Sequence, residues 1–120
     1  MNRLGVARRG EQLAGEYLEG AGYVLRHRNW RCPRGEIDIV AEKNGRMVIV
    51  EVKMRRSQRF GSGEDSVTPR KLTSLEHSAW AYLEAHALLE RSWQVDVIAV
   101  DLDFQGRLLR LDHLQDVLQR

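Results

Sequence analysis

The sequence predicts an α/β protein whose mixed β-sheet is flanked by helices, with the elements in the order α-β-β-β-α-β-β-α. Residues 35–53 read as two alternating strands joined at Asn44-Gly45, which is the strongest short signal for a hairpin. Residues 4–21 and 69–86 each carry an apolar stripe with helical spacing. Residues 93–102 read as a further apolar strand, and hydrophobic strands with helices beside them form a sheet that the helices cover.

Local signals define the remaining elements. Gly20 and Gly22 end the first helix. Thr68 is a helix N-cap, and Pro69 occupies the first position of the second helix. Residues 54–67 are polar, contain two glycines and show no period, which predicts a loop beside the hairpin. Further predicted elements are strands at 23–30 and 107–111 and a short last helix at 112–118, capped by Asp112.

Length and composition indicate one globular domain spanning residues 1–120. Hydrophobic residues make up 42% of the chain and charged residues 30%, which excludes a disordered protein. No apolar run approaches the length of a membrane span, and the charged N-terminal stretch is not a signal peptide. The single Cys32 excludes an internal disulfide and fits a reducing compartment. We therefore expect a cytoplasmic protein without a membrane partner.

The predicted hairpin brings acidic side chains together at its open end. A two-residue turn at Asn44-Gly45 places Asp38 opposite Glu51 and Glu36 opposite Lys53. Opposed carboxylates repel each other unless they share a hard divalent cation such as magnesium, which prefers oxygen ligands. Lys53 projects from the same face as Glu51 because it lies two residues further along the strand. The alternative is a solvated face with a cross-strand Glu36–Lys53 ion pair of little energetic weight.

The opposite face of the hairpin is apolar throughout. We expect it to face the core and to carry Ile37, Ile39, Ala41, Val48, Val50 and Val52.

Glu11 interrupts the apolar stripe of the first helix. It lies one turn after Ala7 and two turns before Leu18. A carboxylate on a core-facing stripe is unfavourable unless it is paired or bound to a cation. Glu11 is therefore either a further acid of the hairpin site or a residue at the edge of the stripe that reaches solvent or an arginine.

Basic residues flank the acidic hairpin. The net charge is only +2, but the isoelectric point is near 9.0 and the cations are clustered. Such clusters can neutralise phosphates, although a solvated basic surface is the simpler explanation. The clusters consist of Arg26, Arg28, Arg31 and Arg34, of Lys53, Arg55, Arg56 and Arg59, and of Arg70 and Lys71.

These residues resemble a known nuclease signature. Asp38, twelve intervening residues and then Glu51-Val52-Lys53 resemble the PD-(D/E)xK motif, with Ile37 in place of its proline. In that motif the preceding helix often supplies a further glutamate, as Glu11 would here. The chain is still more similar to the YraN family of uncharacterised bacterial proteins. The shared motifs are Gly10-Glu11-Gln12-Leu13-Ala14, Gly22-Tyr23, Asn29, Gly35-Glu36-Ile37-Asp38, Val50-Glu51-Val52-Lys53-Met54-Arg55, Phe60-Gly61, Lys71 and Asp96-Val97-Ile98.

The resemblance implies a restriction-endonuclease-like fold, similar to that of Holliday-junction resolvases, and a nuclease dependent on magnesium or manganese. Asp38, Glu51 and Glu11 would be catalytic acids and metal ligands, and Lys53 would orient the attacking water or neutralise developing charge. The expected partner is DNA rather than RNA, recognised by its structure, such as a junction or flap. The protein would be a homodimer. Residues expected to hold the DNA backbone are Arg55, Arg56, Arg59 and Lys71.

Two other functions stay open at this point. The chain could be a non-catalytic nucleic-acid-binding module that keeps the fold, although binding alone does not require opposed carboxylates. It could also be an interaction protein that uses the edge of its sheet.

Overall fold

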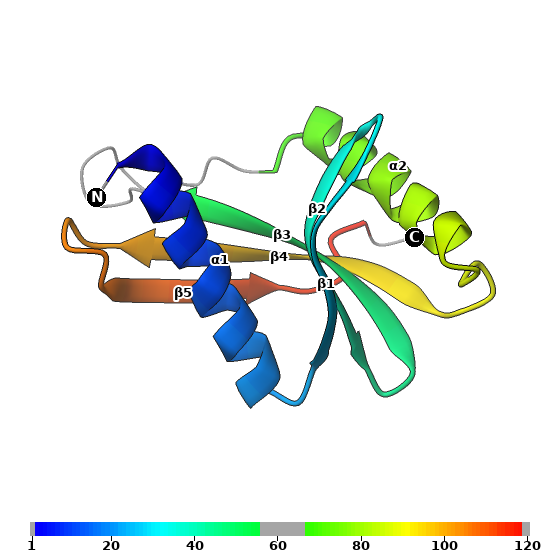
Figure 1. Ribbon diagram of the computed structural model, residues 1–120, viewed down its shortest axis with the longest axis horizontal. Helices are drawn as coiled ribbons and strands as arrows, with labels where there is room; N and C mark the ends of the chain where they lie inside the picture. The colour runs from blue at the N-terminus through cyan, green and yellow to red at the C-terminus, as the bar shows by residue number, and fades with distance from the viewer. Residues whose placement is uncertain (1, 56–66, 119–120) are drawn as a thin grey trace.

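Two helices cover the two faces of a five-stranded mixed sheet in the computed structural model, which describes residues 2–55 and 67–118 (Figure 1). The predicted α/β class and the mixed sheet flanked by helices are thereby confirmed. The elements are α1 (Arg3–Gly20), β1 (Val24–Cys32), β2 (Gly35–Lys43), β3 (Arg46–Arg55), α2 (Pro69–Ala85), β4 (Trp93–Leu102) and β5 (Leu108–Leu114).

The strands lie in the order β1-β2-β3-β4-β5. β1, β2 and β3 are antiparallel neighbours, β3 and β4 are parallel, and β5 returns antiparallel to β4. The parallel pair requires a crossover connection, and α2 provides it. The predicted hairpin register is confirmed from the pair Lys43–Arg46 to the pair Ile39–Val50, and the predicted pairs Asp38–Glu51 and Glu36–Lys53 are not part of the ladder.

Each face of the sheet has its own hydrophobic cluster. Side chains that alternate along a strand point to opposite faces, so neighbouring residues of β3 contribute to different clusters. The cluster under α1 includes Ala14, Leu18, Ile39, Val48, Val50, Ile98 and Val100. The cluster under α2 includes Leu75, Tyr82, Leu83, Val40, Ile49 and Val95. Within the described residues, no helix is long and apolar enough to cross a membrane.

The helix caps follow the sequence signals. The hydroxyl of Thr68 accepts a hydrogen bond from the Lys71 amide at 3.2 Å, and Pro69 opens α2 as predicted. The side chain of Asn2 caps α1 by accepting from the Gly5 amide at 2.8 Å. α1 ends at Gly20, where the sequence placed its end.

The predicted short helix at 112–118 is wrong. β5 continues to Leu114, and residues 115–118 form no helix. Two contacts explain the difference: Leu111 packs against the α1 cluster, and His113 Nε2 lies 2.7 Å from the fully buried carboxylate of Asp96. On its other side, His113 Nδ1 lies 2.8 Å from the Tyr17 hydroxyl. Pairing with β4 thus overrides the capping signal at Asp112.

Ile37 also departs from its predicted position. It packs into the α2 cluster rather than with Ile39 under α1. The β2–β3 ladder ends at the pair Ile39–Val50, so the strict alternation of β2 does not extend beyond this pair. The predicted loop also begins later than expected, because β3 extends to Arg55; its residues 56–66 lie outside the described residues.

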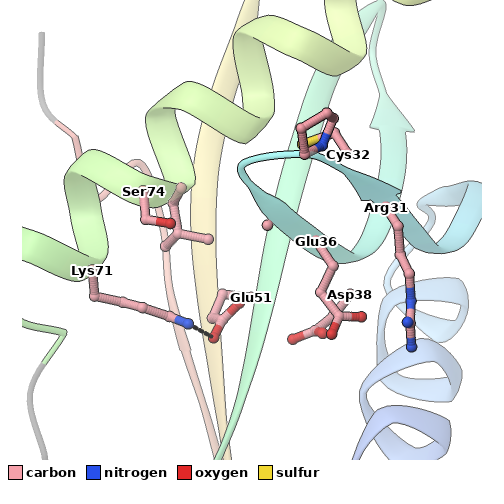
Figure 2. A pocket seen from close by; sticks show the side chains of 10 residues that line it. Arg31, Cys32, Glu36, Asp38, Glu51, Lys71 and Ser74 are labelled. Atoms are coloured by element: carbon pink, nitrogen blue, oxygen red, sulfur yellow. Dashed lines mark ion pairs between the residues drawn. The ribbon is translucent and has the colours of Figure 1, made fainter.

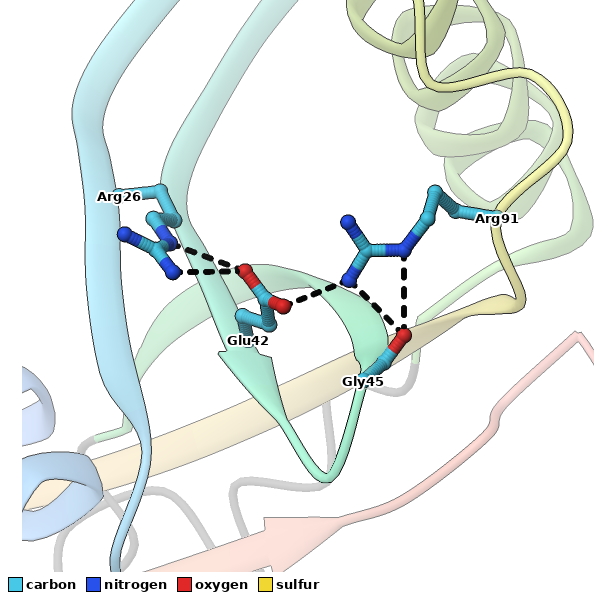
Figure 3. A network of polar contacts seen from close by, with 4 residues as sticks. All are labelled: Arg26, Glu42, Gly45 and Arg91. Atoms are coloured by element: carbon cyan, nitrogen blue, oxygen red, sulfur yellow. Dashed lines mark hydrogen bonds and ion pairs between the residues drawn. The ribbon is translucent and has the colours of Figure 1, made fainter.

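A cluster of ion pairs fastens the hairpin at its turn (Figure 3). The Glu42 carboxylate pairs with Arg26 of β1 at 2.9 Å and with Arg91, which precedes β4, at 2.6 Å. Hydrogen bonds from Arg91, and then from Arg26, hold the pKa of Glu42 below its usual range. Arg91 also donates to the carbonyl of Gly45 at 2.9 Å. The left-handed backbone of Asn44 (φ 52°) and Gly45 (φ 78°) forms the tight turn itself.

Candidate functional site

Acidic and basic side chains line a cavity of about 490 Å³ between α2 and the turn that joins β1 to β2 (Figure 2). Glu36 and Asp38 reach it from β2, Glu51 from β3, and Lys71 and Ser74 from α2. Arg31 of β1 lies on the side away from α2. The cavity therefore gathers side chains from four elements at the open end of the hairpin.

The side chain of Asp38 replaces a backbone hydrogen bond between β2 and β3. Beyond the pair Ile39–Val50 the two strands no longer pair through their backbones. Instead, the amide of Val52 donates to Asp38 Oδ2 at 2.7 Å. The prediction that Asp38 and Glu51 are directly opposed in the ladder is therefore wrong. Both side chains nevertheless line the same cavity. The predicted meeting of the two carboxylates at the open end of the hairpin is therefore retained without the predicted backbone pairing.

The acidic side chains influence one another strongly. Asp38 is only 9% exposed, and this burial, followed by the nearby Glu51 carboxylate, raises the pKa of Asp38 to about 7. The hydrogen bond from Val52 opposes the rise, while Glu11 and Glu36 add to it. The site therefore holds more negative charge than its buried position favours.

The structure places Glu11 of α1 beside this group. Burial raises the pKa of Glu11, and the carboxylates of Glu36 and Glu51 raise it further. A hydrogen bond with the side chain of Asn29 and the charge of Arg28 act in the opposite direction. Glu11 thus lies near the cavity acids without lining the cavity itself, and its role as a ligand remains a prediction.

Asn29, which the sequence analysis named only among the motifs shared with the YraN family, contacts Glu11 beside the cavity. Its φ of 53° is in the left-handed region, in the middle of β1. It lies between the ladder pairs Arg28–Ile39 and Trp30–Ile37, across from Asp38. Asparagine tolerates this conformation better than most residues, and strained backbone of this kind occurs often at functional sites. The sequence offered one signal for this position: asparagine is unfavourable in β-strands, and Asn29 lies in the middle of a predicted strand.

Lys71 neutralises Glu51. Its Nζ lies 3.0 Å from Glu51 Oε2, with 49% of the lysine side chain exposed and 14% of the glutamate side chain (Figure 2). The sequence indicated Lys71 as a contact for DNA and gave no sign of this ion pair. Ser74, one turn further along α2, and Arg31 were likewise not singled out as cavity residues.

The other predicted residues lie elsewhere. Lys53 pairs with Ala99 in the parallel ladder and does not line the cavity. Arg55 forms an ion pair with Asp112 of β5, and its side chain is only 10% exposed. Burial and this pairing leave it poorly placed to contact a ligand. Arg56 and Arg59 lie outside the described residues.

The carboxylates of the cavity are of the kind that binds a hard divalent cation, but they do not lie close enough together to surround one. Carboxylate oxygens are the ligands that magnesium and manganese prefer, and a cation would relieve the repulsion that raises the pKa of Asp38. In residues 2–55 and 67–118, however, no three acidic, histidine or cysteine side chains lie close enough together to hold a metal ion. Glu51 faces Lys71, and Asp38 holds the Val52 amide.

The chain is similar in sequence to a known protein family. Residues 10–100 match the family described as "Uncharacterised protein family UPF0102". The chain belongs to this family. The resemblance to YraN proteins is confirmed, since UPF0102 is the same family.

Several UPF0102 proteins cover nearly the whole chain. That of Moorella thermoacetica is 46% identical over 99 residues, or 82% of each chain. That of Arthrobacter sp. strain FB24 is 44% identical over 112 residues, 93% of this chain and 94% of its own. That of Beutenbergia cavernae is 42% identical over 108 residues, 90% of this chain and 91% of its own.

Two solved structures are more distantly similar. An fdxN element excision controlling factor protein from Anabaena variabilis has a TM-score of 0.38 at 12% identity, over 87% of this chain and 98% of its own. An XisH family protein from Nostoc punctiforme has a TM-score of 0.36 at 14% identity, over 86% and 98%.

Proposed function

We propose that this UPF0102 protein is a nuclease that hydrolyses DNA phosphodiester bonds with the help of magnesium or manganese. One observation carries the proposal: the carboxylates of Asp38 and Glu51, from neighbouring strands, line one cavity together with cationic side chains. Two carboxylates that share a cavity repel each other, and Lys71 pairs with only one of them, so the site favours a ligand that reverses the repulsion. A divalent cation does so.

Asp38 and Glu51 would hold the cation directly, and Glu11 would hold it directly or through water. Once bound, the cation supplies positive charge for the phosphate oxygens and acidity for a bound water. Asn29 keeps the Glu11 carboxylate oriented through its hydrogen bond. Lys53 lies two residues beyond Glu51 but outside the cavity lining, so only the resemblance supports its proposed role of orienting the attacking water or neutralising developing charge.

The cavity cations suggest how a substrate is held. Arg31 and Lys71 flank the acids on two sides, with Ser74 beside Lys71. Contacts of this kind with phosphates position a nucleic acid without reading its sequence. A substrate recognised by shape, such as a DNA junction or flap, therefore fits better than a specific base sequence. The homodimer implied by the resemblance remains a prediction.

A second function is favoured by the Lys71–Glu51 ion pair. If this pair never opens, Glu51 holds no metal and the protein is a nucleic-acid-binding module that retains a nuclease-like fold. The two functions differ in whether cleavage follows binding.

Cleavage of linear duplex, flap and four-way-junction DNA tests the proposal, with magnesium, with manganese and with a chelator. We expect the wild type to cleave only with a cation, and Asp38→Asn to lose on the order of a thousandfold in rate, because a metal contributes several kcal/mol to such transition states. Asp116→Asn is the matched control, since this exposed residue lies after β5 and outside the cavity. Binding without cleavage under every condition would establish the binding module instead.

A further inference from the structure

Lys71 is the internal counter-ion of the acidic site. Its ammonium group lies 3.0 Å from Glu51 Oε2, and no other ion pair of Glu51 is seen within the described residues. The same carboxylate is one of the two expected to bind a cation. Lys71 and a divalent cation therefore compete for Glu51.

The position of Lys71 allows it to leave. About half of its side chain is exposed, and it lies in the first turn of α2, where Thr68 caps the helix. The positive end of the helix dipole and the Ser74 hydroxyl lie on the same wall of the cavity. An anionic phosphate oxygen at this wall is thus a second partner within reach of the lysine.

The charges explain why one ligand would assist the other. A cation alone compensates Asp38 and Glu51 but leaves Lys71 unpaired beside a like charge. A phosphate alone binds Lys71 but leaves two carboxylates uncompensated next to an anion. With both ligands present, every charge has an opposite partner.

We propose that Lys71 couples the two ligands, so that a DNA phosphate draws Lys71 off Glu51 and thereby opens the site to the divalent cation. This inference rests on the proposed function. Coupling of this kind is reciprocal: the cation strengthens phosphate binding by the same factor as phosphate strengthens cation binding.

Two measurements test the inference without relying on cleavage. The first is the affinity for Mn²⁺ in the absence of DNA, followed by calorimetry. Lys71→Met should bind Mn²⁺ more tightly than the wild type, by on the order of tenfold, because the competing ammonium is gone. Arg70→Met removes the same charge from the adjacent exposed residue, which lines no part of the cavity, and should leave Mn²⁺ affinity unchanged.

The second measurement is binding of a fluorescent four-way junction with phosphorothioate linkages, with and without Mn²⁺ at constant ionic strength. The cation should strengthen junction binding by a larger factor in the wild type than in Lys71→Met. Circular dichroism establishes that each variant is folded.

The outcomes separate the inference from the proposed function. Equal or weaker Mn²⁺ binding by Lys71→Met, in proteins that do bind Mn²⁺, overturns the coupling and leaves the metal site intact. A wild type that binds no Mn²⁺ with or without DNA overturns the metal site and the coupling with it.

Discussion

Replacing Asp38 with asparagine should stabilise the protein at alkaline pH in the absence of divalent cations. Burial and the Glu51 carboxylate raise the pKa of Asp38 to about 7 in the folded state. Between about pH 4 and pH 7 the folded protein therefore binds more protons at this position than the unfolded chain does. Stability is highest below the unfolded pKa, falls as the pH rises through this interval, and stays low above the folded pKa.

The size of the effect follows from the shift. A rise from the ordinary aspartate value to about 7 corresponds to about 4 kcal/mol of destabilisation once Asp38 is fully ionised. The asparagine variant has no charge to bury. Its amide oxygen can still accept the hydrogen bond from Val52, so the local structure keeps its main contact. We expect it to exceed the wild type by roughly 2 to 4 kcal/mol near pH 8 and to match it near pH 4.

Urea unfolding of both proteins from about pH 4 to pH 8 in chelator measures this difference. Asp103→Asn is a control of opposite sign, since backbone hydrogen bonding from Arg107 holds the pKa of Asp103 below its usual range. That variant should lose stability relative to the wild type above the carboxyl range and regain it in acid. If the gap between Asp38→Asn and the wild type does not widen as the pH rises, Asp38 is not a strained acid and the metal-site argument loses its basis.

Two further predictions concern the support of the site. In urea unfolding, His113→Leu should lower the free energy of unfolding by about 3 kcal/mol, because it leaves the buried Asp96 carboxylate without its imidazole partner. Tyr17→Phe removes only the hydrogen bond between the Tyr17 hydroxyl and His113, and it should lower the free energy of unfolding by about 1 kcal/mol. Asn29→Gly should retain stability because glycine accepts the left-handed backbone, whereas Asn29→Ala should lose about 1 kcal/mol, and both should weaken Mn²⁺ binding if Glu11 is a ligand. Equal stability of the two Asn29 variants would show that the backbone there is unstrained.

The hairpin was predictable because its signals are local. Asn44-Gly45 determines the turn, and the turn determines which residues pair. From this register alone Asp38 and Glu51 could be expected at one site, and the apolar alternation indicated that Val48 and Val50 share one face of β3. Glu11 was likewise visible as a charge on an apolar stripe.

The features that were missed depend on partners distant in the sequence. The Lys71–Glu51 pair forms only because α2 crosses the sheet, and nothing near Lys71 in the chain indicates which acid it meets. The left-handed backbone of Asn29 is likewise fixed by its surroundings across the strand. β5 continues past its expected end because His113 contacts the carboxylate of Asp96 on β4. Side-chain composition near each residue could not reveal these contacts.

The ion pairs around Glu42 give the β2–β3 hairpin two mechanically different ends. At the turn, Arg26 and Arg91 bind Glu42 from two sides, and Arg91 also holds the Gly45 carbonyl. At the far end, the Val52 amide bonds to the Asp38 side chain in place of a backbone ladder. The hairpin is thus held by several ion pairs and hydrogen bonds at the turn and by the single Val52–Asp38 hydrogen bond at its open end. The spacing of Asp38 and Glu51 therefore depends on one side-chain contact, whereas the spacing of the strands near the turn depends on many.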